Sequence, residues 1–220
     1  MTGKRQQARE KNRLTLIEAV LDSVAEKGIS ETSVSEIIQR AGLSRGMIHL
    51  HFGGKDNLLN EAVKHSSEEY YQGLYALLNA AGDTGQERIE MIVRGDLSEE
   101  VLNRRNVSIW YAFRGEARNR AAIAAYSDTR DAKLRNMVHD AFSRIAQEAG
   151  AAEAADIARD ATHGTLAMLE GMWTDYLLHP DIFDREESVR VVFRFLSALF
   201  PKHFGVNGAI ANGRSKRVDG

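Results

Sequence analysis

The sequence predicts an all-α protein, and three observations lead to that prediction. Apolar residues recur at the spacing of a helix face through almost the whole chain, no run alternates polar and apolar residues as a strand would, and only two prolines occur in 220 residues. Hydrophobic residues make up 43% of the chain and charged residues 27%, which supports a sizeable core and excludes wholesale disorder. We expect about nine helices.

The first expected helix is followed by two short ones, and their ends are marked by glycine and serine. A helix over residues 7–27 has one apolar face and stops at Gly28. Thr32 or Ser33 can cap a second helix that ends at Gly42, and Ser44 can cap a third that ends near Phe52.

A longer series of helices follows. Helices are expected over 55–81, 87–102, 104–114, 120–149, 152–178 and 184–200, with Pro180 and Pro201 just beyond the last two. These elements divide the chain into a basic arm (1–6), a three-helix domain (7–54), a helical bundle (55–201) and a disordered basic tail (202–220).

Several function classes are excluded. With no cysteine, the chain has no disulfide scaffold, thiol nucleophile or thiolate metal site. No apolar run approaches 18 residues and no signal peptide is evident, so we expect a soluble cytoplasmic protein that does not engage a membrane. Gly53, Gly54 and Lys55 imitate a phosphate loop, but Asp56 stands where Ser or Thr is needed. We expect no enzyme, cofactor or metal.

The charge is unevenly distributed although the net charge is only −2. Near the amino terminus five basic residues face a single acid, Glu10, and the body of the chain is acidic. A basic arm on an acidic body suggests a polyanion partner at one end. The alternative is a solvated terminus. The five basic residues are Lys4, Arg5, Arg9, Lys11 and Arg13.

The segment from Ser33 to Phe52 has the pattern of a helix-turn-helix, the motif whose second helix enters the DNA major groove. Gly42 lets the chain reverse, while Leu43 and Ile48 pack the two helices together. Arg45 is the candidate for a bidentate contact to guanine, and Ser33, Ser35, His49 and Lys55 are candidates for phosphate contacts. A plain helical hairpin is the alternative. The complete set of DNA-binding candidates is Ser33, Ser35, Ser44, Arg45, Gly46, Met47, His49, Leu50, His51 and Lys55.

The run GLSRGMIHLHFGGKDNLL, from Gly42 to Leu59, resembles the DNA-binding domain of the TetR family of repressors. One position departs from the family pattern: His49 stands where a phosphate-binding tyrosine is usual. Further motifs at residues 95–97, 110–113 and 169–173 are similar to the choline-responsive repressors of glycine-betaine synthesis genes, the BetI-like branch of that family. The resemblance runs from about residue 7 to 201. It implies a dimeric, ligand-responsive repressor that binds a palindromic operator.

The last two helices are apolar on two opposite faces, which predicts that one face of each is covered by a second copy of the chain. Small residues such as Ala161, Gly164 and Gly171 would permit close helix approach. Burial of both faces by the chain's own helices is the alternative. The predicted dimer interface comprises Ile157, Ala161, Gly164, Met168, Gly171, Val189, Val192, Phe193, Leu196 and Phe200.

Aromatic and acidic residues of the bundle are candidates for an inducer pocket. Aromatic faces attract a quaternary ammonium group, and the resemblance points to choline or a related compound. A core role for the aromatic residues is the alternative. The predicted ligand residues are Asp96, Trp110, Phe113, Tyr126, Glu170, Trp173 and Tyr176. Other functions consistent with the sequence are control of an unrelated catabolic or efflux operon and ligand-independent DNA binding.

Overall fold

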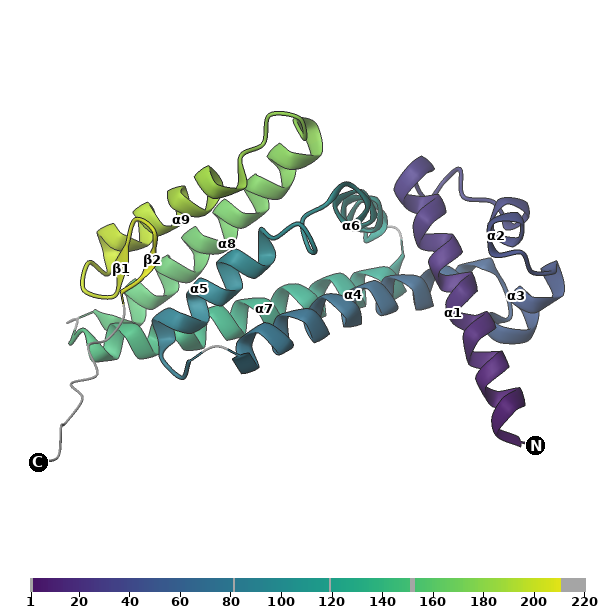
Figure 1. Ribbon diagram of the computed structural model, residues 1–220, viewed down its shortest axis with the longest axis horizontal. Coiled ribbons are helices and arrows are strands. Elements are labelled where there is room, and N and C mark those ends of the chain that lie inside the picture. The colour runs from purple at the N-terminus through teal and green to yellow at the C-terminus, as the bar shows by residue number, and fades with distance from the viewer. Residues whose placement is uncertain (1, 81, 119, 151–152, 211–220) are drawn as a thin grey trace, which may run out of the picture. The chain divides into compact units, whose positions relative to one another are not determined.

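The computed structural model describes residues 2–80, 82–118, 120–150 and 153–210, with backbone only for Thr2 and residues 125–131. Among these residues there are nine helices and one two-stranded sheet, so the predicted all-α fold is confirmed (Figure 1). The elements are α1 (Thr2–Lys27), α2 (Val34–Ala41), α3 (Arg45–Phe52), α4 (Lys55–Ala80), α5 (Gly85–Asp96), α6 (Arg104–Glu116), α7 (Ala121–Glu148), α8 (Ala154–Leu178), α9 (Arg185–Leu199), β1 (Phe204–Gly205) and β2 (Gly208–Ala209).

The chain divides into two compact units. The first comprises Met1–Gly73 and Leu102–Ala132, and the second comprises Leu74–Val101 and Lys133–Gly220. This division differs from the predicted linear one at residue 54, because α6 packs extensively on α1 and so joins the first unit. The boundaries between the units fall inside α4 and α7.

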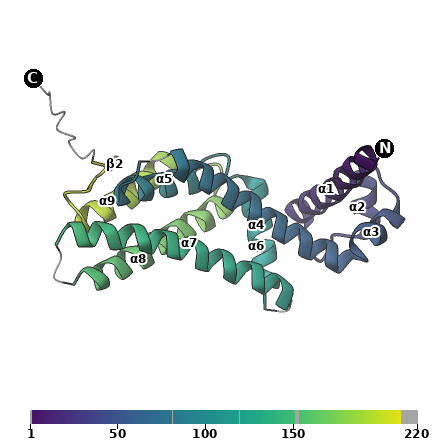
Figure 2. The ribbon, with the colours of Figure 1, turned by 90° about the horizontal axis from the view of Figure 1, so that it is seen from below.

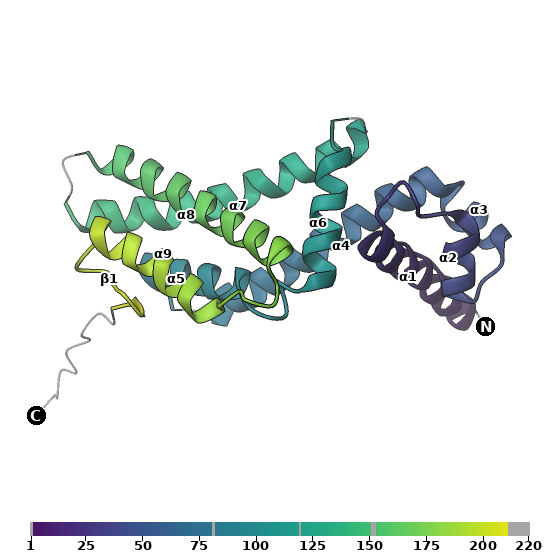
Figure 3. The same cartoon turned by 90° about the horizontal axis from the view of Figure 1, so that it is seen from above.

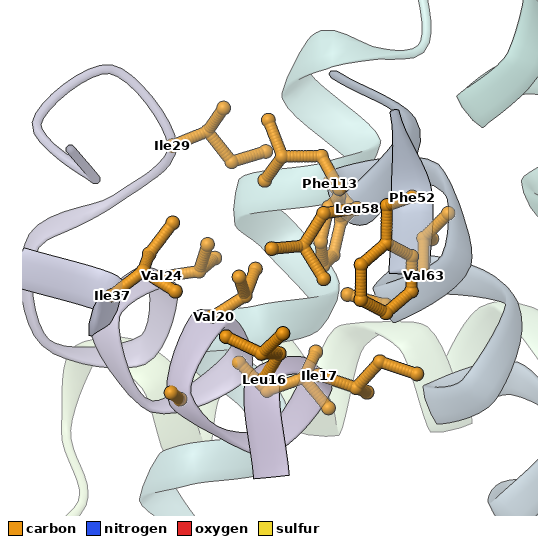
Figure 4. Close-up of a cluster of buried hydrophobic side chains, with 14 of the residues drawn as sticks. Leu16, Ile17, Val20, Val24, Ile29, Ile37, Phe52, Leu58, Val63 and Phe113 are labelled. Carbon is orange, nitrogen blue, oxygen red and sulfur yellow. The ribbon is translucent and has the colours of Figure 1, made fainter. Parts of the chain in front are cut away.

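The core of the first unit is built around the apolar face of α1. α2 and α3 lie against α1, as Figure 2 shows. Leu16, Ile17 and Val20 of α1 are fully buried. They belong to one cluster with Ile37 from α2 and Leu58 from α4 (Figure 4). One stripe of side chains on α1 thus fixes α2, α3 and the start of α4.

In the second unit, α8 and α9 run side by side in opposite directions (Figures 1 and 3). Gly164 of α8 is the point of closest approach, because a Cβ built there would lie 2.5 Å from the ring of Phe195. The close helix approach predicted for Gly164 therefore exists, but its partner is α9 of the same chain.

Several boundaries differ from the prediction. α1 begins at Thr2, so the basic arm over residues 1–6 is helical in its described part rather than a separate segment. α5 begins earlier than predicted because Thr84 and Glu87 form a capping box, and it ends six residues before the predicted Leu102. Residues 202–210, predicted to be disordered, include the β1–β2 hairpin; the remainder of that tail lies outside the described residues.

The hairpin is held on α5 by polar contacts. The backbone N–H of Ala209 donates to the Glu90 carboxylate at 3.0 Å, and Arg94 donates to the Asn207 carbonyl at 2.6 Å. Phe204 of β1 is buried and packs near Phe193 and Phe200. These contacts explain the order of a segment whose composition alone suggests a free tail.

We expect Gly164→Ala to lower the free energy of unfolding by about 1–3 kcal/mol, because the added methyl group would force the Phe195 ring out of its position. Gly73→Ala is the matched control: it lies inside α4 with open space around its Cα, and alanine there should stabilise the helix by about 0.5–1 kcal/mol. Urea unfolding of both variants measures the difference. Equal stabilisation by the two substitutions would contradict the packing of Phe195 on Gly164.

Candidate nucleic-acid interface and ligand site

The helix-turn-helix is set by its caps. The Ser33 side chain accepts a hydrogen bond from the backbone N–H of Glu36 and begins α2. Gly42 ends α2 with φ +64°, in the left-handed region that glycine adopts readily, and its N–H bonds back to the carbonyls of Ile38 and Gln39. The next N–H, of Leu43, also donates to Ile38. This turn reverses the chain and directs it into α3.

The orientation of α3 follows from two buried side chains. Ile48 and Phe52 are four residues apart and both point into the core of the first unit. Other residues of α3 are exposed: Arg45 is its first residue, and His49 and the large apolar side chain of Leu50, which is 63% exposed, lie further along. Gly46 is exposed as well. A cationic side chain, an imidazole and an apolar side chain on one exposed helix suit the polar and methyl-bearing edges of bases in a major groove.

Two residues predicted for the outer face do not lie on it. Met47 is half-buried and packs against the core cluster. His51 is also half-buried, and its Nε2 atom is buried with no hydrogen-bond partner among the described residues. Burial, together with the positive charges of Arg9 and Arg13, lowers the pKa of His51 and favours the neutral imidazole. The sequence pattern does not reveal this inward orientation, since both residues flank the exposed positions.

The predicted phosphate contacts lie at helix starts. Ser33 and Ser35 are exposed at the amino terminus of α2, where unpaired backbone N–H groups favour an anion. Ser44 precedes α3 and makes no capping hydrogen bond with its side chain. Lys55 is the first residue of α4. His49 Nδ1 lies 3.3 Å from the Gly53 carbonyl, so a proton on Nδ1 would donate there and leave Nε2 of the neutral ring as an acceptor for a base amino group; a contact to phosphate needs a proton on Nε2.

The predicted ligand residues fall into both units. In the second unit, Trp173 of α8 donates from its indole Nε1 to the Asp96 carboxylate of α5 at 2.9 Å, and both side chains are only 5% exposed. Glu170 is half-buried one turn earlier on α8. A buried carboxylate next to an indole ring is an arrangement that can receive an organic cation.

Tyr176 lies in a different setting. Its ring meets Phe183 edge to face, and the guanidinium of Arg185 lies over both rings, 5.1 Å from the centre of Tyr176 and 5.9 Å from that of Phe183. Arg185 also donates to the backbone carbonyl of Leu97 at 2.7 Å. The chain's own cation therefore already occupies a face of Tyr176. No local sequence pattern indicates this role of Arg185, which lies nine residues further along.

The aromatic residues of the first unit take other roles. Phe113 is 3% exposed and belongs to the core cluster with α1 (Figure 4). It therefore has the core role that was the alternative to ligand binding. Trp110 is half-buried with the Arg114 guanidinium 5.4 Å from its ring centre. The side chain of Tyr126 lies outside the described part of the chain.

The α9 residues predicted for a dimer interface face the chain's own core, which is the alternative considered for them. Each is at most 7% exposed, and they are Val189, Val192, Phe193, Leu196 and Phe200. The exposed side of α9 carries Val191 and Leu199, which are 43% and 37% exposed. When a helix has two apolar faces, the sequence does not show which of them packs on the chain's own core.

On α8 the predicted interface divides in the same way. Ala161 is fully buried, whereas Ile157, Gly164 and Met168 are half-buried. Gly171 is exposed with open space around it. Of the predicted strip, therefore, Gly171 is the residue that stands open to solvent.

Comparison with known proteins agrees with this architecture. Residues 16–62 match the family described as bacterial regulatory proteins of the tetR family, and residues 85–201 match the BetI-type transcriptional repressor, C-terminal domain. The chain belongs to the TetR family, with a BetI-type carboxy-terminal domain. Members of this family are transcriptional regulators that bind DNA and a small-molecule ligand and are not enzymes.

Individual relatives match over most of their length. The regulator BetI of Stenotrophomonas maltophilia is 27% identical over 82% of this chain and 89% of its own. A transcriptional regulator from Pseudomonas aeruginosa PAO1 is similar in structure, with a TM-score of 0.78 and 26% identity over 87% of this chain and 91% of its own. A regulator from Saccharomonospora viridis, solved in complex with choline, has the same fold, with a TM-score of 0.75 and 18% identity over 86% of this chain and 96% of its own. None of the helices in the described residues has the length and apolarity to span a membrane.

The inward orientation of His51 predicts a pH dependence of stability. Because the folded state lowers the pKa of His51, its contribution to the unfolding free energy is present above the ordinary histidine pKa of about 6.5 and is lost as the pH falls below it. We expect wild-type protein to lose more stability between about pH 7.5 and about pH 5.5 than His51→Gln does.

The control is His49→Gln, on the exposed face of the same helix, which should keep the pH dependence of the wild type. Urea unfolding at the two pH values gives the comparison. The same loss of stability in wild type and His51→Gln would show that the imidazole is not held neutral by the fold.

Proposed function

We propose that the chain acts as a homodimer that represses transcription by inserting α3 into successive major grooves of a palindromic operator, and that a quaternary ammonium compound, choline above all, weakens this binding. The observation that carries the DNA-binding part is the outer face of α3, where Arg45, His49 and Leu50 are exposed while Ile48 and Phe52 anchor the helix. A repressor acts where its operator lies, which places the protein in the cytoplasm.

The dimer is supported by the exposed sides of α8 and α9. Ala167, Gly171 and Leu178 are exposed on α8, and Val191 and Leu199 are exposed on α9. α8 and α9 pack together, so these residues belong to one pair of helices. Two such pairs can form a four-helix interface around a two-fold axis, and two reading helices related by that axis match a palindrome.

The choice of choline is supported by chemistry and by relatives. Asp96 and Trp173 provide a carboxylate and an indole in a buried setting, which suits a desolvated trimethylammonium group. Several relatives carry the BetI name, and the relative from Saccharomonospora viridis was solved with choline. The BetI-type domain extends this likeness across α5 to α9, since it matches residues 85–201.

Repression is released by linkage between the two sites. An inducer that weakens operator binding must itself bind more weakly to the DNA-bound form by the same factor. α4 and α7 each pass from one compact unit into the other, so they are the segments through which a change around Asp96 would reach α3. Coupling energies of this kind are about 1–3 kcal/mol.

The operator is found by selecting bound fragments from the source genome and reading the neighbouring genes. We expect Arg45→Ala to lose about 1–3 kcal/mol of discrimination at one base pair of each half-site. Lys55→Ala should weaken binding to all duplexes alike and reduce the salt dependence of binding by about one phosphate contact. Competition binding with operator and scrambled duplexes at two salt concentrations distinguishes the effects of the two variants.

The dimer is tested by stoichiometry. Sedimentation of the complex should give two chains per operator.

Two results would contradict this arrangement. Binding that does not change with salt would exclude the phosphate contacts. A lone chain on each operator would exclude the dimer.

Choline titrated into the operator complex should release the DNA. Asp96→Asn keeps an acceptor for the Trp173 indole but removes the negative charge, and we expect it to weaken choline binding about tenfold, or about 1.4 kcal/mol. Asp175→Asn, exposed on the same helix as Trp173, is the control and should bind choline as the wild type does. Calorimetry on free protein and on the operator complex gives both affinities.

If the operator complex does not respond to choline but responds to another compound, the protein is still a ligand-responsive repressor, with a different inducer. That result is expected for a catabolic or efflux operon. A complex that responds to no small molecule would make the protein a ligand-independent DNA binder.

A further inference from the structure

Three side chains with metal-binding atoms converge in the first unit, away from the exposed face of α3. Glu18 comes from α1, while His65 and Glu69 lie one turn apart on α4. The Nε2 atom of His65 lies 3.3 Å from a carboxylate oxygen of Glu18 and 3.3 Å from one of Glu69. One imidazole nitrogen therefore faces two carboxylates from two different helices.

The spacing of these atoms matches a metal coordination sphere. Zn²⁺ is bound by histidine nitrogen at about 2.0–2.1 Å and by carboxylate oxygen at about 2.0–2.2 Å, so neighbouring ligand atoms of a tetrahedral site lie about 3.3–3.5 Å apart. Both distances from His65 have this value, and the three donor atoms all lie within 4.8 Å of one another. Small side-chain adjustments would bring the two carboxylates onto a common ion.

The surroundings orient one ligand. Arg105 of α6 donates to the second carboxylate oxygen of Glu18 at 2.7 Å and to Asp22 at 2.7 Å. Holding one oxygen of a ligating carboxylate in this way directs the other oxygen to the metal.

The charge and accessibility also suit a divalent ion. Glu18, Glu69 and Asp22 are acidic, and Arg105 offsets one of the three charges. The side chain of His65 is 22% exposed, and those of Glu18 and Glu69 are 43% and 56% exposed, so an ion can enter from solvent. A nitrogen ligand favours Zn²⁺ and similar transition metals over Mg²⁺ or Ca²⁺, which prefer all-oxygen sites.

We propose that Glu18, His65 and Glu69 form a binding site for a divalent transition-metal ion, with Zn²⁺ the best match and water completing the coordination. The bound ion joins α1 to α4 within the unit that carries α3, and it stabilises that unit because it binds the folded state. The site does not depend on the operator or on choline. A charged imidazole bridging two carboxylates without any metal is the competing interpretation.

The test uses full-length protein freed of metal with a chelator. Titration with Zn²⁺ by calorimetry, and with Co²⁺ by its visible absorption, should show one site per chain and a rise in melting temperature. His65→Gln and Glu69→Gln should each weaken Zn²⁺ binding about tenfold or more and abolish most of that rise. Glu68→Gln is the matched control, because Glu68 is the neighbouring exposed acid and its carboxylate faces Lys64 instead.

Two results would overturn the proposal. One is no binding of micromolar Zn²⁺ by the wild type, which would favour the metal-free imidazole bridge. The other is binding that survives both His65→Gln and Glu69→Gln, which would locate the ion elsewhere. Circular dichroism shows that each variant is folded, and because two independent ligands are replaced, one unfolded variant still leaves a decisive measurement.

Discussion

The apolar stripe of α1 is the constraint on which the DNA-reading segment depends. α2 and α3 are eight residues each, too short to be stable alone, so their positions come from packing on Leu16, Ile17 and Val20. Ile48 and Phe52 complete this packing from α3. Arg45, at the amino-terminal end of α3, and His49 remain exposed beside these two buried side chains. The recognition surface is therefore a consequence of core packing rather than a separate feature.

The second unit applies the same principle to two helices with apolar residues on more than one face. Phe195 packs on Gly164, and the fully buried Val192 and Leu196 fix which side of α9 turns inward. The remaining side, with Val191 and Leu199, is left for solvent or a partner. The hydrogen bond from Trp173 to Asp96 then ties α8 to α5 and places a carboxylate inside the second unit. The proposed ligand residues Asp96 and Trp173 and the proposed dimer residues Val191 and Leu199 thus belong to one packed set of helices, the first two buried and the last two exposed.

Charged groups supply connections that hydrophobic packing leaves open. Arg105 joins α6 to α1 through Glu18 and Asp22, and Arg185 joins the start of α9 to Leu97 and to the ring of Tyr176. Both arginines combine a hydrogen bond with a second contact, which suits the planar guanidinium. Such contacts link residues that are nine to almost ninety positions apart, and no local sequence pattern predicts them.

Local chemistry was sufficient to predict much of this protein from its sequence. Glycine at a left-handed position ends α2, serine caps it, and helical periodicity marks nine helices, because each of these effects acts within one or two turns of chain. Arg45 and His49 are exposed, as expected, although helical periodicity alone places Arg45 on nearly the same side of α3 as Phe52. Only tertiary structure decided that Met47 and His51 turn inward, that Phe113 is core, and that α9 buries Val192 rather than Val191. Those outcomes depend on which distant side chains meet a given face, and a periodic pattern records that a face is apolar without recording what covers it.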